Sequence, residues 1–165
     1  MSTNTQIEQY VSQHAPDVNF LGCFWNNTLP NTVPENSNII ANYSANTDDT
    51  NGTHWIAMIN LNPTNGQDTY YFDSFGEKPD QNNSILDTHA HFKNYMTSHS
   101  RSYICNKDEL QGVTSSVCGH YCCLAVVSQS IPIPNKNHGT VWRKLCSKHT
   151  TPEENDELIR QMIKL

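Results

Sequence analysis

The sequence predicts a domain that contains both α-helices and β-strands, and three features lead to this prediction. Residues 54–61 and 69–72 are apolar runs joined by a loop that contains Asn65-Gly66, which is the pattern of a β-hairpin. Residues 115–130 form an apolar stretch of helical length. Residues 151–154 read Thr-Pro-Glu-Glu, the pattern of a capped helix start.

The N-terminal half is predicted to begin with a helix and to continue as strands. Ile7, Tyr10 and Val11 share one helical face, and Pro16 ends that helix. The short apolar stretch 20–24 precedes a loop rich in Pro and Asn. A strand at 38–44 and a polar loop then lead to the hairpin, whose strands we expect at His54–Leu61 and Thr69–Phe72.

The C-terminal half is predicted to be mostly helical, with one strand at 102–105. Helical spacing of apolar residues predicts a helix at 83–99; these residues are Ile85, Leu86, His89, Phe92 and Met96. The stretch 115–130 is apolar on nearly all sides, so we expect it to be buried at the centre of the domain. The last helix has an apolar face of Leu158, Ile159, Met162 and Ile163.

Length and charge restrict the class of protein. The 165 residues fit a single domain, 1–165. The formal net charge of −6 argues against a protein whose main function is to bind nucleic acid. The chain begins without an apolar signal region and has no apolar run near the ~18 residues that span a membrane. We therefore expect a monomer in a reducing intracellular compartment, with its six cysteines as free thiols.

Cys118 is the candidate nucleophile. Ser115 and Ser116 are good N-cap residues, so a helix is expected to begin at or just before Cys118. Free N–H groups and the helix dipole at that end stabilise a thiolate, the reactive form of cysteine. The small Gly119 lets a substrate backbone come close. Cys122 and Cys123, which lie one turn further into the buried stretch, are expected to be inert core thiols.

His54 and Asp73 are the candidate base and its orienting acid. A turn centred between Pro63 and Thr64 places them directly opposite each other, whereas a turn centred on Thr64 pairs His54 with Ser74. Facing residues have Cβ atoms ~4.5–5.5 Å apart, so the carboxylate can reach the imidazole and fix its tautomer. Taken alone, a His and an Asp near the open end of a hairpin are also common in hairpins that have no catalytic role.

Gln111 joins these residues as a candidate oxyanion donor. It precedes Cys118 in a short loop, and its amide N–H can act together with the backbone N–H of Cys118. His89 and His91 are two apart on a helix and point to different sides, so they make a poor metal pair. No Cys/His spacing matches a zinc site, and no metal or other cofactor is expected for the chemistry.

Four segments follow one another in an informative order: Asn19-Phe20-Leu21-Gly22, Gly52-Thr53-His54-Trp55-Ile56-Ala57, Tyr71-Phe72-Asp73-Ser74-Phe75-Gly76, and Gln111-Gly112 followed by Ser115-Ser116-Val117-Cys118-Gly119 and Cys122-Cys123. They resemble, in sequence order, the Phe-Leu-Gly, Gly-x-His-Trp-x-Ala, Leu-Phe-acid-Pro-Phe-Gly and Gln-Gly…Cys-Gly…Cys-Cys motifs of the adenain family, the adenovirus-type maturation proteases. The order His, acid, Gln, Cys is also that of the wider group that contains SUMO-deconjugating proteases.

This resemblance implies an α+β fold in which a central mixed sheet packs on a buried helix that bears the nucleophilic cysteine, a papain-like or SUMO-protease-like core. It implies a cysteine endopeptidase with His54, Asp73, Gln111 and Cys118 as catalytic residues. Its substrates would be viral capsid and core precursor proteins with glycine near the scissile bond, cleaved in the virion or in the host cytoplasm or nucleus. Trp55 would line the substrate groove beside Gly119, or alternatively pack on the core.

The chain also departs from the family. Asp73 stands where adenoviral enzymes mostly carry Glu, and Ser74 replaces a proline. The chain is also shorter, chiefly after Pro134. We expect its source to be a virophage, a Polinton-like element or a divergent virus, and its Asn-rich composition, which suits an AT-rich genome, fits the first two. Family members are stimulated by DNA, which the net charge of −6 disfavours here, and by a disulfide-linked viral peptide. Cys105 is the candidate attachment point for such a peptide, or alternatively a plain thiol.

The sequence leaves two other functions open. A SUMO- or ubiquitin-like deconjugating protease has the same order of catalytic residues. A binding module that kept the fold without catalysis is the alternative from another class.

Overall fold

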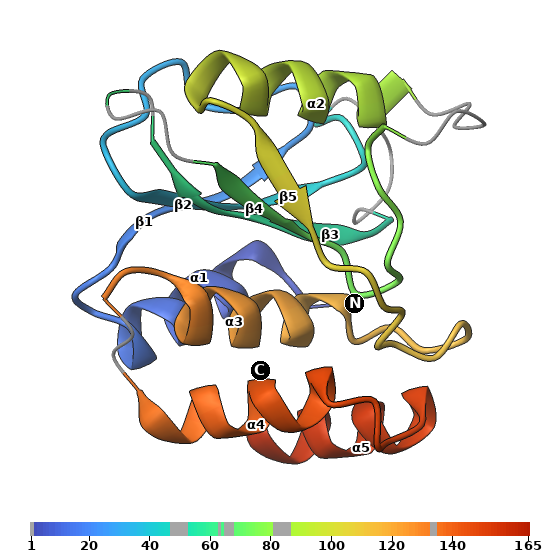
Figure 1. Ribbon diagram of the computed structural model, residues 1–165. Coiled ribbons are helices and arrows are strands. Elements are labelled where there is room, and N and C mark those ends of the chain that lie inside the picture. Colours follow the sequence, from blue (N-terminus) through green and yellow to red (C-terminus); the bar gives the residue numbers. More distant parts are fainter. Residues whose placement is uncertain (1, 47–52, 63, 65–67, 81–86, 133–134) are drawn as a thin grey trace.

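The computed structural model of the chain describes all residues except 1, 47–52, 63, 65–67, 81–86 and 133–134. One helix followed by four strands makes up the first half of the chain, and helices dominate the second (Figure 1). In the described residues the elements are α1 (Asn4–His14), β1 (Asn19–Trp25), β2 (Ser37–Asn42), β3 (Trp55–Leu61), β4 (Thr69–Phe72), α2 (Asp87–His99), β5 (Tyr103–Cys105), α3 (Cys118–Gln129), α4 (Lys136–Cys146) and α5 (Pro152–Met162).

The strands form one mixed sheet in the order β1-β2-β3-β4-β5. The outer pairs, β1 with β2 and β4 with β5, are parallel, whereas β3 pairs antiparallel with both of its neighbours. In Figure 1, α2 lies on one face of the sheet, α1 and α3 lie on the other, and α4 and α5 form a further layer beyond α3. This arrangement confirms the α+β class and the central mixed sheet.

The sheet is buried on both faces because β3 contributes side chains to two apolar clusters. Ala57 and Ile59 join the cluster on the side of α1 and α3. Ile56 and Met58 join the cluster on the side of α2. Such alternation is the normal consequence of a strand's two-residue period. The helix α3 packs directly against β3, so the start of α3 is held in a fixed position against the sheet.

Most elements lie where the sequence predicts them. The capping box at Thr151 begins α5, and the apolar face of α1 is buried as expected. The predicted Asn65-Gly66 turn, and Ile85 and Leu86 of the predicted helix at 83–99, lie outside the described residues. Helix α4 was not predicted, although Asn135 caps it and the spacing of its buried residues His138, Trp142 and Leu145 is helical.

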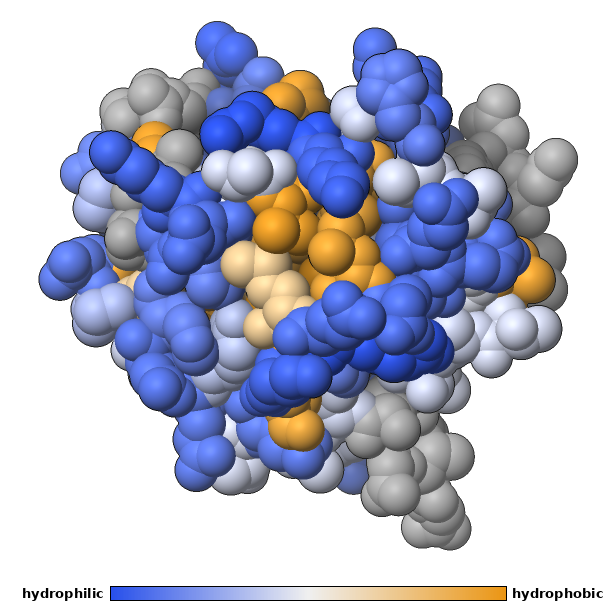
Figure 2. All heavy atoms as spheres, turned by 90° about the horizontal axis from the view of Figure 1, so that it is seen from below, coloured by the Kyte–Doolittle hydropathy of each residue, from blue (hydrophilic) through white to orange (hydrophobic). Residues whose placement is uncertain are grey.

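The face formed by α4 and α5 carries an apolar area. Partly buried side chains of these helices and of the C-terminal residues pack against the core; they are Val141, Leu158, Met162 and Leu165. Figure 2, which views the molecule from this side, shows hydrophobic atoms gathered at the centre within a hydrophilic rim. None of the helices in the described ranges has the length and apolar character needed to cross a membrane.

Candidate active site

Cys118 is the first residue of α3 and is 3 % exposed. The predicted N-caps Ser115 and Ser116 are wrong, because Val117 occupies that position and no side chain caps the helix. Ser115 instead donates its hydroxyl to the carbonyl of Gly112, at 3.1 Å. Since the first intrahelical bond runs from Tyr121 N to Val117 O, the N–H groups of Cys118, Gly119 and His120 have no partner within the helix. An uncapped start leaves them available to an anion.

His54 lies between a carboxylate and the Cys118 thiol. Its Nε2 is 2.8 Å from Oδ1 of Asp73, and Asp73 has no solvent exposure. Burial opposes a charge on the ring, but the interactions with Asp73 and Cys118 outweigh it and raise the pKa of His54 to about 9. The neighbouring Trp55 N–H points at the Cys118 sulfur, at 3.5 Å. Because Nε2 is used by Asp73, Nδ1 is the nitrogen left for the thiol.

Both predicted hairpin registers are wrong, although Asp73 does reach His54. The observed pairs are Ala57 with Phe72 and Met58 with Tyr71, and continuing them places His54 opposite Phe75. The rings of His54 and Phe75 accordingly stack at a centroid distance of 4.9 Å. Asp73 is thus the diagonal neighbour of His54, two residues away from the directly facing position.

Further hydrogen bonds fix Asp73 in this diagonal position. Its Oδ1 also accepts from the N–H of Phe75, at 2.8 Å, and Oδ2 accepts from the hydroxyl of Tyr43, at 2.8 Å. Asn106 binds the backbone of Asp73 on both sides, accepting from its N–H and donating to its carbonyl. Tyr43 and Asn106 could not be found from the sequence, because each lies about 30 residues or more from Asp73 in the chain.

The Gln111 side chain is buried and held at both ends of its amide. Its oxygen accepts from the hydroxyl of Ser74, at 2.5 Å, and its nitrogen donates to the carbonyl of Ser115, at 3.0 Å. The backbone carbonyl of Ser74 also accepts a hydrogen bond from the backbone N–H of Gln111. Ser74, which stands where the family motif has a proline, therefore orients Gln111. One amide hydrogen of Gln111 remains after these contacts.

Helix α5 anchors the loop that carries Gln111. The buried carboxylate of Asp156 accepts from the N–H of Gly112, at 3.1 Å, and from the hydroxyl of Tyr121, at 2.8 Å. Asn155 donates to the carbonyl of Leu110, at 3.0 Å. A Cβ at Gly112 would approach Asp156 Oδ2 to 2.8 Å, so only glycine fits there without a shift of the carboxylate.

We expect Asp156→Ala to lower the free energy of unfolding by about 1–3 kcal/mol, because the N–H of Gly112 loses its acceptor and the hydroxyl of Tyr121 keeps only the carbonyl of Leu110. Urea denaturation followed by circular dichroism measures the change. Glu157→Ala, on the exposed side of the same helix, serves as the control and should change stability by less than about 0.5 kcal/mol. Equal effects of the two substitutions would contradict the anchoring role of Asp156.

Trp55 and Gly119, the two residues predicted to bind substrate, both lie beside Ser2. Trp55 is 3 % exposed and donates its indole N–H to the carbonyl of Ser2, at 3.1 Å. A Cβ at Gly119 would lie 3.2 Å from the Cβ of Ser2 and 3.1 Å from the side chain of Ile7. The small size of Gly119 thus serves close packing against α1. The core-packing alternative for Trp55 fits these contacts, and a role of either residue in substrate binding stays a prediction.

The remaining cysteines differ from Cys118 in position. Cys122 and Cys123 are completely buried in the core, and burial raises the pKa of both thiols. Cys105 lies on β5, where burial and the charge of Asp80 raise its pKa to about 11. All six cysteines are free thiols. Within the described ranges, no group of three or more His, Cys, Asp or Glu residues is placed to hold a metal ion.

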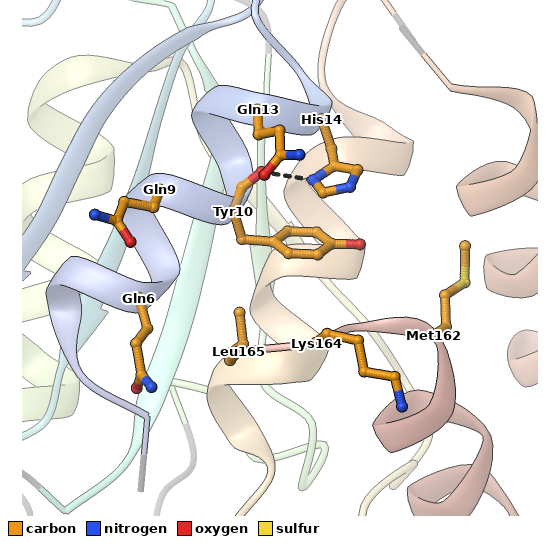
Figure 3. A pocket seen from close by; sticks show the side chains of 8 residues that line it. All are labelled: Gln6, Gln9, Tyr10, Gln13, His14, Met162, Lys164 and Leu165. Atoms are coloured by element: carbon orange, nitrogen blue, oxygen red, sulfur yellow. Dashed lines mark hydrogen bonds between the residues drawn. The ribbon is translucent and has the colours of Figure 1, made fainter.

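Two cavities lie near the N-terminal residues. A cavity of about 330 Å³ borders the start of α3 and is lined by Ser2, Gln6, Ser116, Val117, His120, Arg160 and Leu165. A second cavity, of about 320 Å³, opens between α1 and the C-terminal residues (Figure 3). Its glutamines and His14 surround Tyr10, whose carbonyl accepts from His14 Nδ1, at 3.0 Å. None of the four predicted catalytic residues lines this second cavity, so it is separate from the candidate site.

Comparison with known proteins assigns the chain to a family. The family model described as adenovirus endoprotease matches residues 20–142, which is well over half of the chain and includes all four predicted catalytic residues. No individual protein among the curated ones matches the chain. With a family match that spans the sheet, α2, α3 and much of α4, the chain belongs to the adenovirus endoprotease family of cysteine peptidases.

Proposed function

We propose that this chain is a cysteine endopeptidase with Cys118 as nucleophile, His54 as general base and acid, Asp73 as the group that orients His54, and Gln111 as an oxyanion donor. The observation that carries the proposal is the position of His54, bound to a buried carboxylate on one side and next to a thiol at an uncapped helix start on the other.

The proposed chemistry is acyl transfer through a thioester. The thiol proton passes to His54, and the sulfur of Cys118 attacks the substrate carbonyl carbon. The C–N bond then breaks, and the leaving amine takes the proton from His54. A water molecule, deprotonated by the same ring, attacks the thioester and releases the acid and the free thiol. Asp73 keeps the ring in the tautomer that this sequence of proton transfers needs.

Charge develops on the carbonyl oxygen in the first step, and the start of α3 is suited to receive it. The backbone N–H of Cys118 and the remaining amide hydrogen of Gln111 are the proposed donors. The N–H of Trp55, at 3.5 Å from the sulfur, supports the negatively charged thiolate. Each donor is fixed before the substrate arrives, which is the condition for effective electrostatic stabilisation.

We propose viral capsid and core precursor proteins as substrates, with glycine near the scissile bond and processing in the virion or the infected cell. Membership of a viral protease family supports a viral protein substrate. The tight surroundings of Cys118, which is 3 % exposed, favour residues with little side chain. A substrate group that binds at the indole N–H of Trp55 has to displace Ser2, whose carbonyl accepts that N–H, and Ser2 also lies beside Gly119.

An activating peptide, which the family resemblance suggests, has Cys105 as its proposed attachment point. Cys105 borders a cavity of about 240 Å³ that is also lined by Tyr70, Phe72, Trp142 and Cys146. Its pKa of about 11 makes the thiolate scarce at neutral pH, so linkage there would be slow without a basic environment or a catalyst.

The test is cleavage of the capsid precursor encoded with this protein by the purified chain. We expect defined products from the precursor and no release of a diglycine-linked SUMO or ubiquitin. Turnover of the diglycine-linked modifier with none of the precursor would favour the deconjugating alternative. Absence of both activities would contradict the proposal.

We expect Gln111→Ala to lower kcat by about 10²–10³-fold with little change in KM, because an oxyanion donor acts mainly in the transition state. Steady-state kinetics on the precursor measure both constants. Gln13→Ala, an exposed glutamine outside the site, is the matched control and should leave both constants unchanged. A Gln111→Ala enzyme with a raised KM and a normal kcat would assign Gln111 to substrate binding instead.

A further inference from the structure

Tyr43 contacts two of the four proposed catalytic residues. It follows β2 directly, and its backbone N–H donates to the carbonyl of His54, at 3.0 Å. Its hydroxyl donates to Oδ2 of Asp73, at 2.8 Å. Its ring meets the ring of His54 edge-on, with centroids 5.0 Å apart and an angle of 77° between the planes. Tyr43 therefore touches both members of the His54–Asp73 pair at once.

The hydroxyl of Tyr43 has a second partner on α2. Nε2 of His89 lies 2.9 Å from it, and His89 is 3 % exposed. Since the single proton of the phenol is directed to Asp73, the hydroxyl oxygen accepts from His89, whose Nε2 must then carry a hydrogen. The hydrogen bonds run in one direction, from His89 to Tyr43 to Asp73.

The backbone of Tyr43 is also fixed. Its carbonyl accepts from the hydroxyl of Thr88 on α2, at 3.0 Å, and from the side-chain amide of Asn26. The same Asn26 amide donates to Thr88, at 3.0 Å. Burial and the nearby carboxylate of Asp73 raise the pKa of the Tyr43 phenol, so it stays protonated and remains a donor.

We propose that Tyr43 is a positioning residue for catalysis: its hydroxyl, held by His89, fixes the Asp73 carboxylate in the orientation that presents Oδ1 to His54. This inference rests on the proposed function and extends it to residues that the sequence motifs do not contain. Asp73 Oδ1 receives two donors, and Oδ2 receives Tyr43. Without the hydroxyl, Oδ2 is a buried, charged oxygen with one fewer donor, and the carboxylate gains freedom to rotate away from His54.

The experiment compares Tyr43→Phe with Tyr95→Phe in the full chain. Tyr95 is a matched control, since its hydroxyl also makes a hydrogen bond to the protein, to Pro30 O at 2.7 Å, with no contact to Asp73. The first readout is the rate of Cys118 alkylation by iodoacetamide near pH 7, followed by mass spectrometry. The second is the separation of kcat from KM on the capsid precursor.

We expect Tyr43→Phe to slow alkylation and to lower kcat by about tenfold each, with KM within about twofold. Tyr95→Phe should leave all three constants within about twofold, even where both variants lose similar thermal stability. If the hydroxyl of Tyr43 served only the stability of the fold, Tyr43→Phe would lower the thermal stability, as Tyr95→Phe does, and would leave the alkylation rate of Cys118 unchanged. Tyr43→Phe with wild-type alkylation and kcat overturns the proposal.

A second pair of variants decides the case if Tyr43→Phe folds poorly. His89→Leu removes the donor to Tyr43, whereas His89→Gln can keep a nitrogen donor near the same place. We expect His89→Leu to slow alkylation about threefold or more and His89→Gln to restore most of that rate. Equal rates in the two variants overturn the role of this hydrogen-bond chain. A wild-type Cys118 that reacts no faster than Cys146 refutes the proposed function itself, which is a distinguishable outcome.

Discussion

Cys118→Ala is expected to abolish cleavage of the precursor, lowering kcat/KM by at least about 10⁴-fold. The substitution removes the atom that attacks the carbonyl, and neither Gln111 nor the helix start can replace it. Binding should survive, because the side chain contributes little contact surface. The measurement is cleavage at high enzyme concentration, followed by gel electrophoresis over hours, with binding of the uncut precursor measured separately.

Cys146→Ala is the matched control for the nucleophile. Cys146 is an exposed free thiol on α4, outside the candidate site. Its replacement should leave kcat/KM within about twofold. Cleavage that persists in Cys118→Ala and disappears in Cys146→Ala would reassign the nucleophile and contradict the whole arrangement.

His54→Ala is expected to have the second largest effect, a loss of about 10³-fold or more in kcat/KM on the precursor. The ring takes the thiol proton, donates to the leaving amine and activates water, so its loss affects each chemical step. Because Asp73 then has no imidazole to orient, adding Asp73→Ala should cause little further loss.

His149→Ala controls for the loss of a histidine as such, since His149 is exposed and distant from the site in sequence. It should retain wild-type kinetics. A His54→Ala enzyme that keeps more than about a tenth of the wild-type kcat/KM would show that another group acts as the base. Independent, additive losses from His54→Ala and Asp73→Ala would contradict the claim that the two act as a unit.

The parts of the site that the sequence predicts well are those governed by local pattern. Cys118 lies at a helix start because the apolar stretch behind it must be buried, and the strand pattern around residues 55–61 places His54 directly before the start of β3. The predicted serine caps were wrong, since Ser115 binds Gly112 within the loop. Local sequence can indicate that a helix begins, but the competition among several polar partners is decided by the surrounding fold.

The contact between His54 and Asp73 was predicted for a partly wrong reason. Pairing by turn centre gave a directly facing position, whereas the real register leaves Phe75 opposite His54 and Asp73 on the diagonal. The carboxylate still reaches the ring because Tyr43 and Asn106 hold it there. Register is sensitive to a shift of a single residue, and sequence alone does not fix it.

Helix α4 and the support of Gln111 show what the sequence analysis missed. Arg143 and Lys144 lie in the last turn of α4, and a short segment with adjacent charges does not stand out, although Trp142 and Leu145 are buried at helical spacing. Asp156 contacts Gly112 across 44 residues of chain, and Tyr43 contacts His89 across 46. Contacts of this range depend on how the layers pack, which no local pattern reports.

The pairing of the Cys118 thiol with the His54 imidazole is tested most directly by the pH dependence of Cys118 alkylation in the wild-type chain and in His54→Ala. With the pKa of His54 raised to about 9, the ring keeps at neutral pH the proton that it takes from the thiol and can stabilise the thiolate beside it. We predict that the rate at which wild-type Cys118 reacts with iodoacetamide shows an inflection near pH 9, where the ring of His54 loses its proton. In His54→Ala this inflection should be absent, because the ring that loses the proton is gone. A single, identical curve in both proteins would contradict the account.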